Sequence, residues 1–158
     1  MSRPTSRLLP LFSWLVLCFL VALLNAQVTD PGEWYQALDK PAWTPPGWLF
    51  GPAWTLLYTL MGVAAFLVWE HRRTPLARLA LGLFLLQLAF NAAWSWLFFQ
   101  QQAIGLALID LAALWLALAA TLVVFFRVRP AAGYLLVPYL LWVTYAAALN
   151  GAIVALNP

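Results

Sequence analysis

Five long stretches of this 158-residue chain contain no ionisable side chain of Asp, Glu, Lys, Arg or His. They cover the ranges 8–29, 41–69, 79–109, 111–126 and 130–158. A helix needs about 20 predominantly apolar residues to cross a bilayer. In lipid, an unbroken apolar run must satisfy its own backbone polar groups, which a helix does. The stretches do not alternate with the period of two that a membrane β-strand requires. The sequence therefore predicts an all-α protein that spans a membrane.

Composition excludes the soluble classes of protein. Hydrophobic residues make up 65% of the chain and charged residues 8%, whereas soluble domains carry about 25% charged residues. The exposed surface must therefore be largely apolar and face the lipid bilayer, and a nucleic-acid partner is not expected. Cys18 is the single cysteine and His71 the single histidine. We therefore expect no disulfide framework, no metal site and no resident cofactor.

Turn-forming and charged residues divide the apolar stretches into five expected helices, at about 8–27, 47–69, 77–99, 103–126 and 132–155. Together they use most of the chain, so residues 1–158 are expected to form a single five-helix membrane bundle. The first segment could instead be a cleaved signal peptide, because Arg3 and Arg7 precede it. Its apolar core is long for a signal peptide, and residues 24–26 match a cleavage site poorly. We expect it to be a retained helix.

The first loop, at about 28–46, is long and rich in aromatic residues. It contains Trp34, Trp43 and four prolines, and proline restricts both its own backbone and that of the preceding residue. We expect a stiff loop with a short helix that is capped by Asp30 and has Pro31 in its first turn. Long aromatic loops are more often functional than plain connectors.

The basic residues predict the orientation in the membrane. With five spans, the N-terminus and the loops near 70–76 and 127–131 share one side. That side holds seven arginines, and the other side holds only Lys40. Because positively charged loops stay in the cytoplasm, we expect the N-terminus to be cytoplasmic. The first loop and the C-terminus would then lie outside.

Polar and aromatic side chains gather on particular faces of three of the expected helices. Gln87, Asn91 and Ser95 follow the i, i+4, i+8 spacing of one helical face. Trp94 lies beside this face on the same helix. Two other expected helices carry similar stripes, which consist of Trp54 and Tyr58 at 47–69 and of Trp142, Ala146, Leu149 and Asn150 at 132–155. Gly51 and Gly62 offer positions where two helices can approach closely. These side chains could hold the helices together, or line a cavity for a flat apolar ligand. The spacing alone leaves both interpretations open.

Asp110 is the only acidic residue inside an expected span. Such a carboxyl group is either paired or protonated for structural reasons, or takes part in proton chemistry. No second acid, lysine or histidine lies in a span, so an ion-driven pump is not expected.

Three segments resemble one known family. The first is WYQALDKPAWTPP at 34–46 followed by Trp54 and Tyr58, the second is QLAFN at 87–91, and the third is PYLLW at 138–142 with Leu-Asn at 149–150. Together they resemble the TspO/MBR family of tryptophan-rich sensory proteins and translocator proteins, also called the peripheral benzodiazepine receptor group. The resemblance covers nearly the whole chain.

The resemblance implies a five-helix bundle, often dimeric, with a pocket under the first loop. Members bind protoporphyrin IX and related tetrapyrroles, benzodiazepine-type ligands and, in animals, cholesterol. The porphyrin-reactive tryptophans of the family correspond to Trp54 and Trp142, which would be catalytic if porphyrin is degraded. Further positions implied to bind ligand are Tyr58, Asn91, Trp94, Ala146 and Leu149, with Trp34 and Trp43 as cover from the loop.

Two departures from the family pattern concern ligands. The residues after Asn150 lack the aromatic and basic pair of a proposed cholesterol motif. Animal members have a pocket tryptophan where this chain has Leu106, which predicts a less aromatic wall.

We therefore expect a membrane receptor or sensor that binds porphyrin and acts in tetrapyrrole regulation or stress responses. The alternatives are a light- and oxygen-dependent porphyrin-degrading enzyme and a transporter of tetrapyrrole, lipid or sterol. The expected location is the inner membrane of a bacterium, and the protein could form a homodimer.

Overall fold

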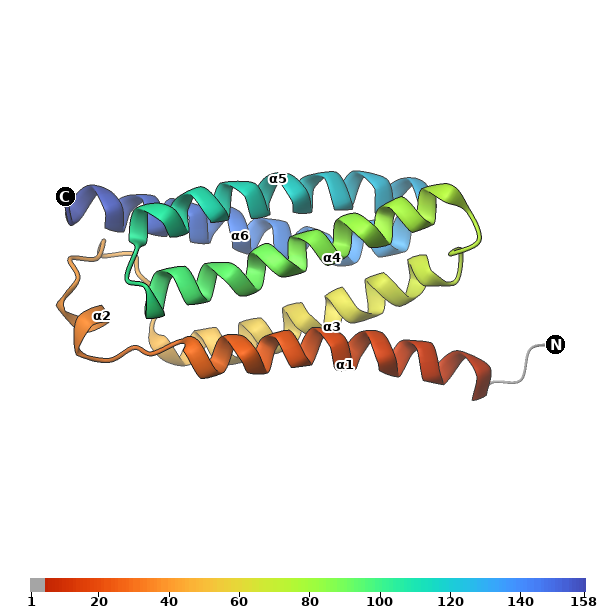
Figure 1. Cartoon of the computed structure of the whole chain (residues 1–158), viewed down its shortest axis with the longest axis horizontal. Helices are drawn as coiled ribbons and strands as arrows, with labels where there is room; N and C mark the ends of the chain where they lie inside the picture. Colours follow the sequence, from red (N-terminus) through yellow and green to blue (C-terminus); the bar gives the residue numbers. More distant parts are fainter. Residues whose placement is uncertain (1–4) are drawn as a thin grey trace.

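The computed structural model describes residues 5–158, and the side chains from residue 8 onward. Over this range five long helices run along the molecule (Figure 1), with shorter helical elements in the first loop and at the ends of two spans. The elements are α1 Thr5–Val28, α2 Glu33–Ala37, η1 Gly47–Leu49, α3 Phe50–Trp69, α4 Pro75–Ser95, η2 Trp96–Gln100, α5 Ile104–Val128 and α6 Pro130–Leu156. No strand occurs in the part of the chain described, which confirms the all-α fold.

Five helices are long and apolar enough to cross a membrane. The candidate spans are Leu8–Val28, Gly47–Trp69, Pro75–Gln100, Ile104–Val128 and Pro130–Leu156. They match the five predicted segments, with differences only at the helix ends. The chain is therefore an integral, multi-pass membrane protein. Arg3, one of the basic residues used to predict orientation, lies outside the described residues.

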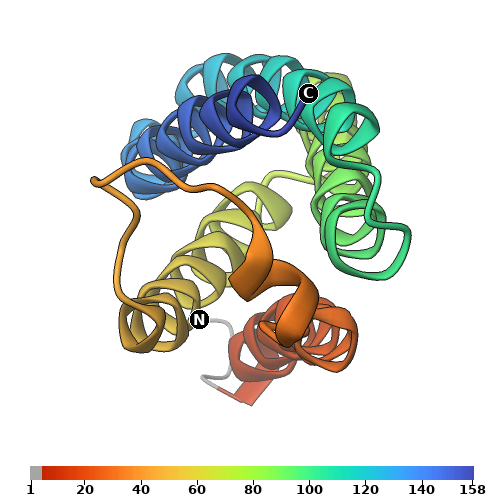
Figure 2. The same ribbon diagram turned by 90° about the vertical axis from the view of Figure 1, so that its left-hand side faces the viewer.

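The long helices run up and down and form a ring. α1 packs on α3, α3 on α6, α6 on α5 and α5 on α4, and smaller contacts between α1 and α4 close the circle. Figure 2 views the ring from the end that carries the first loop, and shows the loop and α2 crossing that end. This arrangement places side chains from every long helix around a common interior.

Proline and capping residues set the starts of two helices. The Thr74 side chain accepts a hydrogen bond from the backbone N–H of Ala77, and Pro75 occupies the first turn of α4. This satisfies a backbone donor that the first turn would otherwise leave unpaired. Pro130 similarly begins α6. Between η2 and α5, Gln102 adopts a left-handed backbone with φ of 53°, which allows the chain to reverse within three residues.

Glycine lets α1 approach α3 closely. A Cβ atom on Gly62 would lie 2.7 Å from Leu15 Cδ2 and 3.1 Å from Leu15 Cα, so the predicted close approach at Gly62 is confirmed. The same prediction for Gly51 is wrong, because nothing lies within 4 Å of the position a Cβ would take there.

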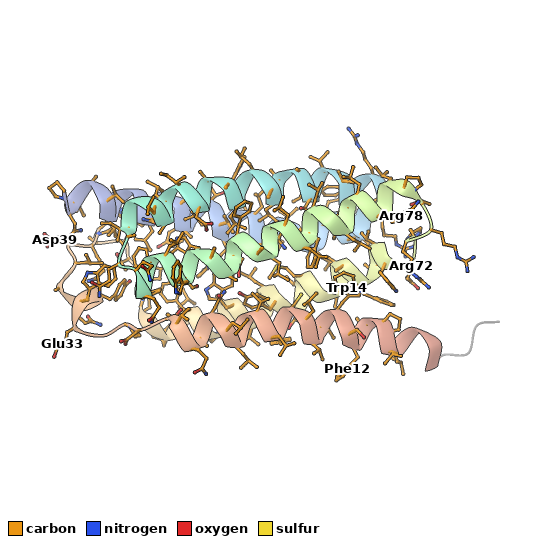
Figure 3. The ribbon with its side chains drawn as sticks, viewed as in Figure 1. Phe12, Trp14, Glu33, Asp39, Arg72 and Arg78 are labelled. Atoms are coloured by element: carbon orange, nitrogen blue, oxygen red, sulfur yellow. The ribbon has the colours of Figure 1, made fainter. Side chains whose placement is uncertain are left out.

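The two faces of α1 meet different surroundings. Phe12 points away from the bundle and is 65% exposed, while Trp14 points toward it (Figure 3). The Trp14 ring meets those of Trp69 and Phe84 edge to face, each at 5.8 Å between centroids. Edge-to-face aromatic pairs add stability beyond the buried area. This end of α1 is thus anchored by aromatic packing.

The short helix in the first loop begins later than predicted. Gly32 is the N-cap of α2 and no side chain caps it. Asp30 and Pro31 therefore precede the helix, and the predicted cap and first-turn proline are wrong. The Asp30 carboxyl oxygens lie 3.1 Å from the position a Gly32 Cβ would take.

Hydrogen bonds fasten the first loop to α6 and the residue after it, and join the end of α1, where the loop begins, to η2. Asn157, beyond α6, accepts from the Asp39 N–H at 3.0 Å and donates to the Asp39 carbonyl at 2.9 Å. The Tyr145 hydroxyl donates to the Trp43 carbonyl at 2.8 Å. Gln100 donates to the Val28 carbonyl at 2.9 Å. The loop is therefore held across the end of the ring.

Candidate functional site

A cavity of about 710 Å³ lies inside the helix ring beneath the first loop. This volume falls within the range of about 300–1,000 Å³ that is typical of small-molecule sites. Its lining comes from all five long helices and from the loop, and most of the lining is apolar. The ring arrangement of the helices thus creates one interior site.

Aromatic rings form one wall of the cavity. Trp54 stacks on Tyr58 with centroids 5.4 Å apart and an interplanar angle of 30°. The rings of Trp54 and Trp142 meet edge to face at 6.2 Å and 79°, and Trp142 meets Phe50 at 5.9 Å. α3 supplies Phe50, Trp54 and Tyr58 at helical spacing, and the packing of α6 against α3 adds Trp142.

The three interior tryptophans differ in their hydrogen bonding. The indole N–H of Trp94 donates to Asn150 Oδ1 at 3.1 Å, and Asn150 in turn donates to the Ile104 carbonyl at 3.0 Å. Among the described residues, the indole N–H groups of Trp54 and Trp142 have no such partner. Trp94 is therefore tied to α6, whereas Trp54 and Trp142 line the cavity with indole N–H groups that no described residue accepts from.

A connected set of polar groups forms the inner end of the cavity. The Tyr58 hydroxyl donates to Asn91 Oδ1 at 2.6 Å, and Asn91 Nδ2 donates to the Tyr139 hydroxyl at 2.9 Å. Asn25 Nδ2 donates both to the Tyr58 hydroxyl at 2.8 Å and to Asn91 Oδ1 at 3.0 Å. Asn25, Tyr58 and Asn91 line the cavity. This set links α1, α3, α4 and α6 within the membrane.

Residues of the first loop line the outer end of the cavity. Tyr35, Gln36 and Lys40 line it from α2 and its flank, together with Thr44 and Pro45. Tyr35 contacts Phe98 and Phe99 at centroid distances of 6.3 and 5.7 Å. Burial raises the pKa of the Tyr35 phenol above its usual value.

The structure brings the predicted helix residues together around this cavity. All seven line it: Trp54, Tyr58, Asn91, Trp94, Trp142, Ala146 and Leu149. Whether they bind a ligand remains a prediction. Ser95 and Asn150 also line the cavity.

The two tryptophans predicted as loop cover lie elsewhere. Trp34 packs against Phe98 at 5.8 Å and does not belong to the cavity lining. Trp43 contacts Tyr145 at 5.7 Å and lines a second, more open groove of about 670 Å³ between α3 and α6. Tyr35, Gln36 and Lys40 take the place of these tryptophans as cover.

Leu106 also differs from its expected position. It is 58% exposed on the outer face of α5 and does not line the cavity. α5 instead contributes Leu111 and Leu114. The prediction that Leu106 forms part of the pocket wall is therefore wrong, because its side chain faces away from the interior.

Two polar residues of the spans, one buried and one half-buried, stand apart from the cavity. Gln87 is fully buried, and neither atom of its amide has a hydrogen-bond partner among the described residues. Asp110 is half-buried, and its Oδ2 atom likewise has no partner in that part of the chain. Neither residue belongs to the cavity lining. The polar face of α4 therefore has two parts, because Gln87 packs inside the bundle while Asn91 and Ser95 line the cavity.

Sequence reasoning missed Asn25 and Lys40 as cavity residues. Asn25 is a lone amide in an apolar helix, and its partners lie 33 and 66 positions away in the chain. In the sequence, Lys40 predicts only the orientation of the chain in the membrane. An isolated polar residue in a span is the signal that would have identified Asn25. The position of Lys40 depends on how the loop folds back.

The comparisons with known proteins agree with this architecture. Residues 14–156 match the model of the TspO/MBR family. A tryptophan-rich protein TspO of Chlorobaculum tepidum is 40% identical over 148 residues, which are 90% of this chain and 92% of that protein. The protein CrtK of Rhodobacter capsulatus is 41% identical over 83% of this chain and 82% of its own length. The human translocator protein is 44% identical over 75% of this chain and 71% of its own length. With a matching five-span bundle and a cavity under the first loop, the chain belongs to the TspO/MBR family.

Proposed function

We propose that this protein is a membrane receptor or sensor for a porphyrin such as protoporphyrin IX, with a role in tetrapyrrole regulation or stress response. One observation carries the proposal. Trp54 and Trp142 meet at 6.2 Å on the wall of a 710 Å³ cavity, and neither indole N–H is used by the described residues. Flat apolar ligands stack on aromatic faces, and free donors can orient them.

The rest of the cavity supports a flat ligand. Its body would lie against apolar side chains from five helices, while Tyr58 and Asn91 offer polar groups at the inner end. One relative is named for sensing: a homologue of Cereibacter sphaeroides, 40% identical over 149 residues, is called a tryptophan-rich sensory protein. This name supports a sensory role here.

A titration of the purified protein with protoporphyrin IX tests this proposal. Binding should quench tryptophan fluorescence, and the variant Trp54→Ala/Trp142→Ala should weaken it about tenfold or more, because each stacked ring contributes about 0.5–1.5 kcal/mol. Trp96→Ala serves as the matched control, since Trp96 is exposed outside the cavity. Unchanged affinity in a folded double variant would refute the proposed site.

Light- and oxygen-dependent degradation of porphyrin is a second candidate function. It is favoured by the contact of Trp54 with Tyr58 and with Tyr139, at 5.4 and 6.2 Å. These rings place oxidisable groups next to Trp54: Tyr58 belongs to the cavity wall, and Tyr139 lies outside the lining. Trp54 and Trp142 would then be catalytic, as electron donors.

The variant Trp54→Phe/Trp142→Phe separates the two functions. Phenylalanine keeps a ring for stacking but is far harder to oxidise than tryptophan. Binding should survive, and illuminated decay of porphyrin should stop if the protein is the catalyst. Equal decay with the wild type and the variant would exclude catalysis by these residues.

We also propose that the N-terminus is cytoplasmic and that the protein lies in the inner membrane of a bacterium. Figure 3 places Arg72 and Arg78 at one end of the bundle and Glu33 and Asp39 at the other, and basic ends stay in the cytoplasm. Alkaline phosphatase fused after Pro158 should be active, because it folds only outside the cytoplasm. If the fusion after Pro158 is inactive and a fusion in the loop at 70–74 is active, the orientation is the reverse of the proposed one.

A homodimer is proposed on the outward face of α4, where Ala89 is exposed and Ala93 half-buried. Small residues allow membrane helices to approach closely. Ala89→Leu should shift the purified protein toward the monomer in light scattering. The same change at Ala112, exposed on α5, is the control.

A further inference from the structure

Lys40 holds an unusual position at the outer end of the cavity. It is the only lysine of the chain, and among the described residues that line the cavity it is the only one with a charged side chain. The acidic residues of the same loop, Asp30, Glu33 and Asp39, are absent from that lining. The interior therefore carries one positive charge at its mouth.

The hydrogen bonds of Lys40 go to carbonyl groups. Its Nζ donates to the carbonyl oxygens of Tyr35 at 2.6 Å, Leu38 at 2.8 Å and Gln36 at 3.3 Å. It also lies 4.8 Å from the centroid of the Tyr35 ring. These contacts fix the ammonium group at the C-terminal end of α2, beside the cavity. The bond to Gln36 is the longest and is the one most easily exchanged.

Carbonyl partners orient this charge but do not neutralise it. Carbonyl oxygens are neutral acceptors, whereas hydrogen bonds between an ammonium and a carboxylate are shorter and roughly twice as strong. Lys40 is half-buried, so its charge is screened less than that of a fully exposed side chain. A ligand carboxylate at the cavity mouth would therefore find a held, partly desolvated cation.

We propose that Lys40 recognises a carboxylate on the ligand, so that the cavity selects flat apolar molecules with an acidic edge. This inference rests on the proposed function, because it assumes that the flat ligand occupies the same cavity. The acidic edge would face the first loop, and the apolar body would lie deeper against Trp54 and Trp142. Protoporphyrin IX, whose two propionates share one edge, has this chemistry.

Comparison of an acid with its ester separates charge recognition from loop structure. Protoporphyrin IX and its dimethyl ester share the ring system, but only the first carries carboxylates. Wild-type protein should bind the diacid about tenfold more tightly, because a charge-assisted hydrogen bond stabilises the complex by roughly that factor. Lys40→Gln should remove this preference by weakening the diacid alone.

Three further measurements sharpen the assignment. Lys40→Arg keeps the charge and should retain most of the preference. Arg127→Gln removes a positive charge from the last turn of α5, outside the cavity lining, and should leave both affinities unchanged. Pyrenebutyric acid and its methyl ester repeat the comparison with a flat ligand that is not a porphyrin.

The outcomes distinguish the two proposals. If neither porphyrin binds while the pyrene acid is preferred over its ester through Lys40, the proposed porphyrin function fails and the carboxylate site stands. If both porphyrins bind with equal affinity, or Lys40→Gln weakens acid and ester alike, Lys40 only shapes the loop and the inference is wrong. The inference is also wrong if neither the porphyrin pair nor the pyrene pair shows a preference for the acid that depends on Lys40.

Discussion

At the scale of single residues, polar side chains in this membrane bundle fall into bonded and unbonded groups. Asn25, Asn91 and Asn150 are bonded to partners on other helices. The indoles of Trp54 and Trp142 leave their donors free among the described residues. An amide bonded to another helix stabilises the bundle, while a donor without a protein partner on a residue that lines the cavity is available to a ligand. The two groups should therefore respond differently to substitution.

Asn91→Leu should lower the stability of the protein. Asn91 accepts from Tyr58 and donates to Tyr139, and each hydrogen bond inside a membrane protein contributes about 0.6 kcal/mol on average. We expect a loss of about 1–3 kcal/mol, since the remaining partners are also left unpaired. Unfolding in mixed detergent would measure it.

Gln87→Leu is the matched control for this prediction. Gln87 lies one turn earlier on α4, is equally buried and has no partner for its amide among the described residues. Replacing it with a side chain of similar size should leave stability unchanged or raise it. A loss as large as that of Asn91→Leu would mean that burial, rather than hydrogen bonding, determines the effect.

The residues that sequence reasoning placed correctly share one property. Trp54, Trp94 and Trp142 lie on faces defined by local helical spacing, which the sequence displays directly. Asn25 and Lys40 join the cavity through contacts with segments far along the chain or through the path of a loop. Leu106, which the family resemblance places at the pocket wall, is exposed instead, and α5 lines the cavity through Leu111 and Leu114. Local periodicity is readable, whereas the fitting together of helices and loops is not.

At the scale of helices and loops, two contacts determine how the cavity is enclosed. α1 approaches α3 at Gly62, and the first loop is fastened to the end of α6 through Asn157. α1 supplies part of the cavity wall, and the loop supplies its cover. Each contact can be weakened by one substitution.

Gly62→Ala should destabilise the packing of α1 on α3. The new Cβ would lie 2.7 Å from Leu15 Cδ2 and 3.1 Å from the Leu15 backbone, so the two helices must separate slightly. Overpacking of this kind costs about 1–3 kcal/mol. Gly82→Ala is the control, because nothing lies within 4 Å of that position and alanine favours a helix. Thermal unfolding of both variants in the same detergent would compare them. Equal melting temperatures would contradict the close approach.

Asn157→Ala should loosen the first loop. Its side chain makes both hydrogen bonds to the backbone of Asp39, and each is worth about 0.5–1.5 kcal/mol. We expect the loop at 28–46 to be cleaved several-fold faster in limited proteolysis. Asp39→Ala is the control, since Asp39 contributes only backbone atoms to this pair. Cleavage at the same rate in all three proteins would show that the other loop contacts suffice.

At the scale of the whole molecule, the bundle is unevenly packed. In the most apolar 18-residue stretch of the first span, only 6% is buried inside the protein. The corresponding share in the other four spans is 28–39%. α1 nevertheless lines the cavity through Phe19, Ala22, Leu23, Asn25 and Ala26. A ligand in the cavity would therefore touch both the loosest helix and the more tightly packed ones.

This unevenness predicts where ligand binding will stabilise the protein. A ligand that binds only the closed bundle stabilises it by about 2.7 kcal/mol at a hundredfold excess over Kd. That stabilisation should be greatest where local opening is easiest. Hydrogen exchange with and without protoporphyrin IX should therefore show the strongest added protection at 19–46, and little change in the outward half of α5. The variant Trp54→Ala/Trp142→Ala should lose the effect under the same conditions. Protection spread evenly over all five helices would mean that the ligand stabilises the bundle without bridging α1 to it.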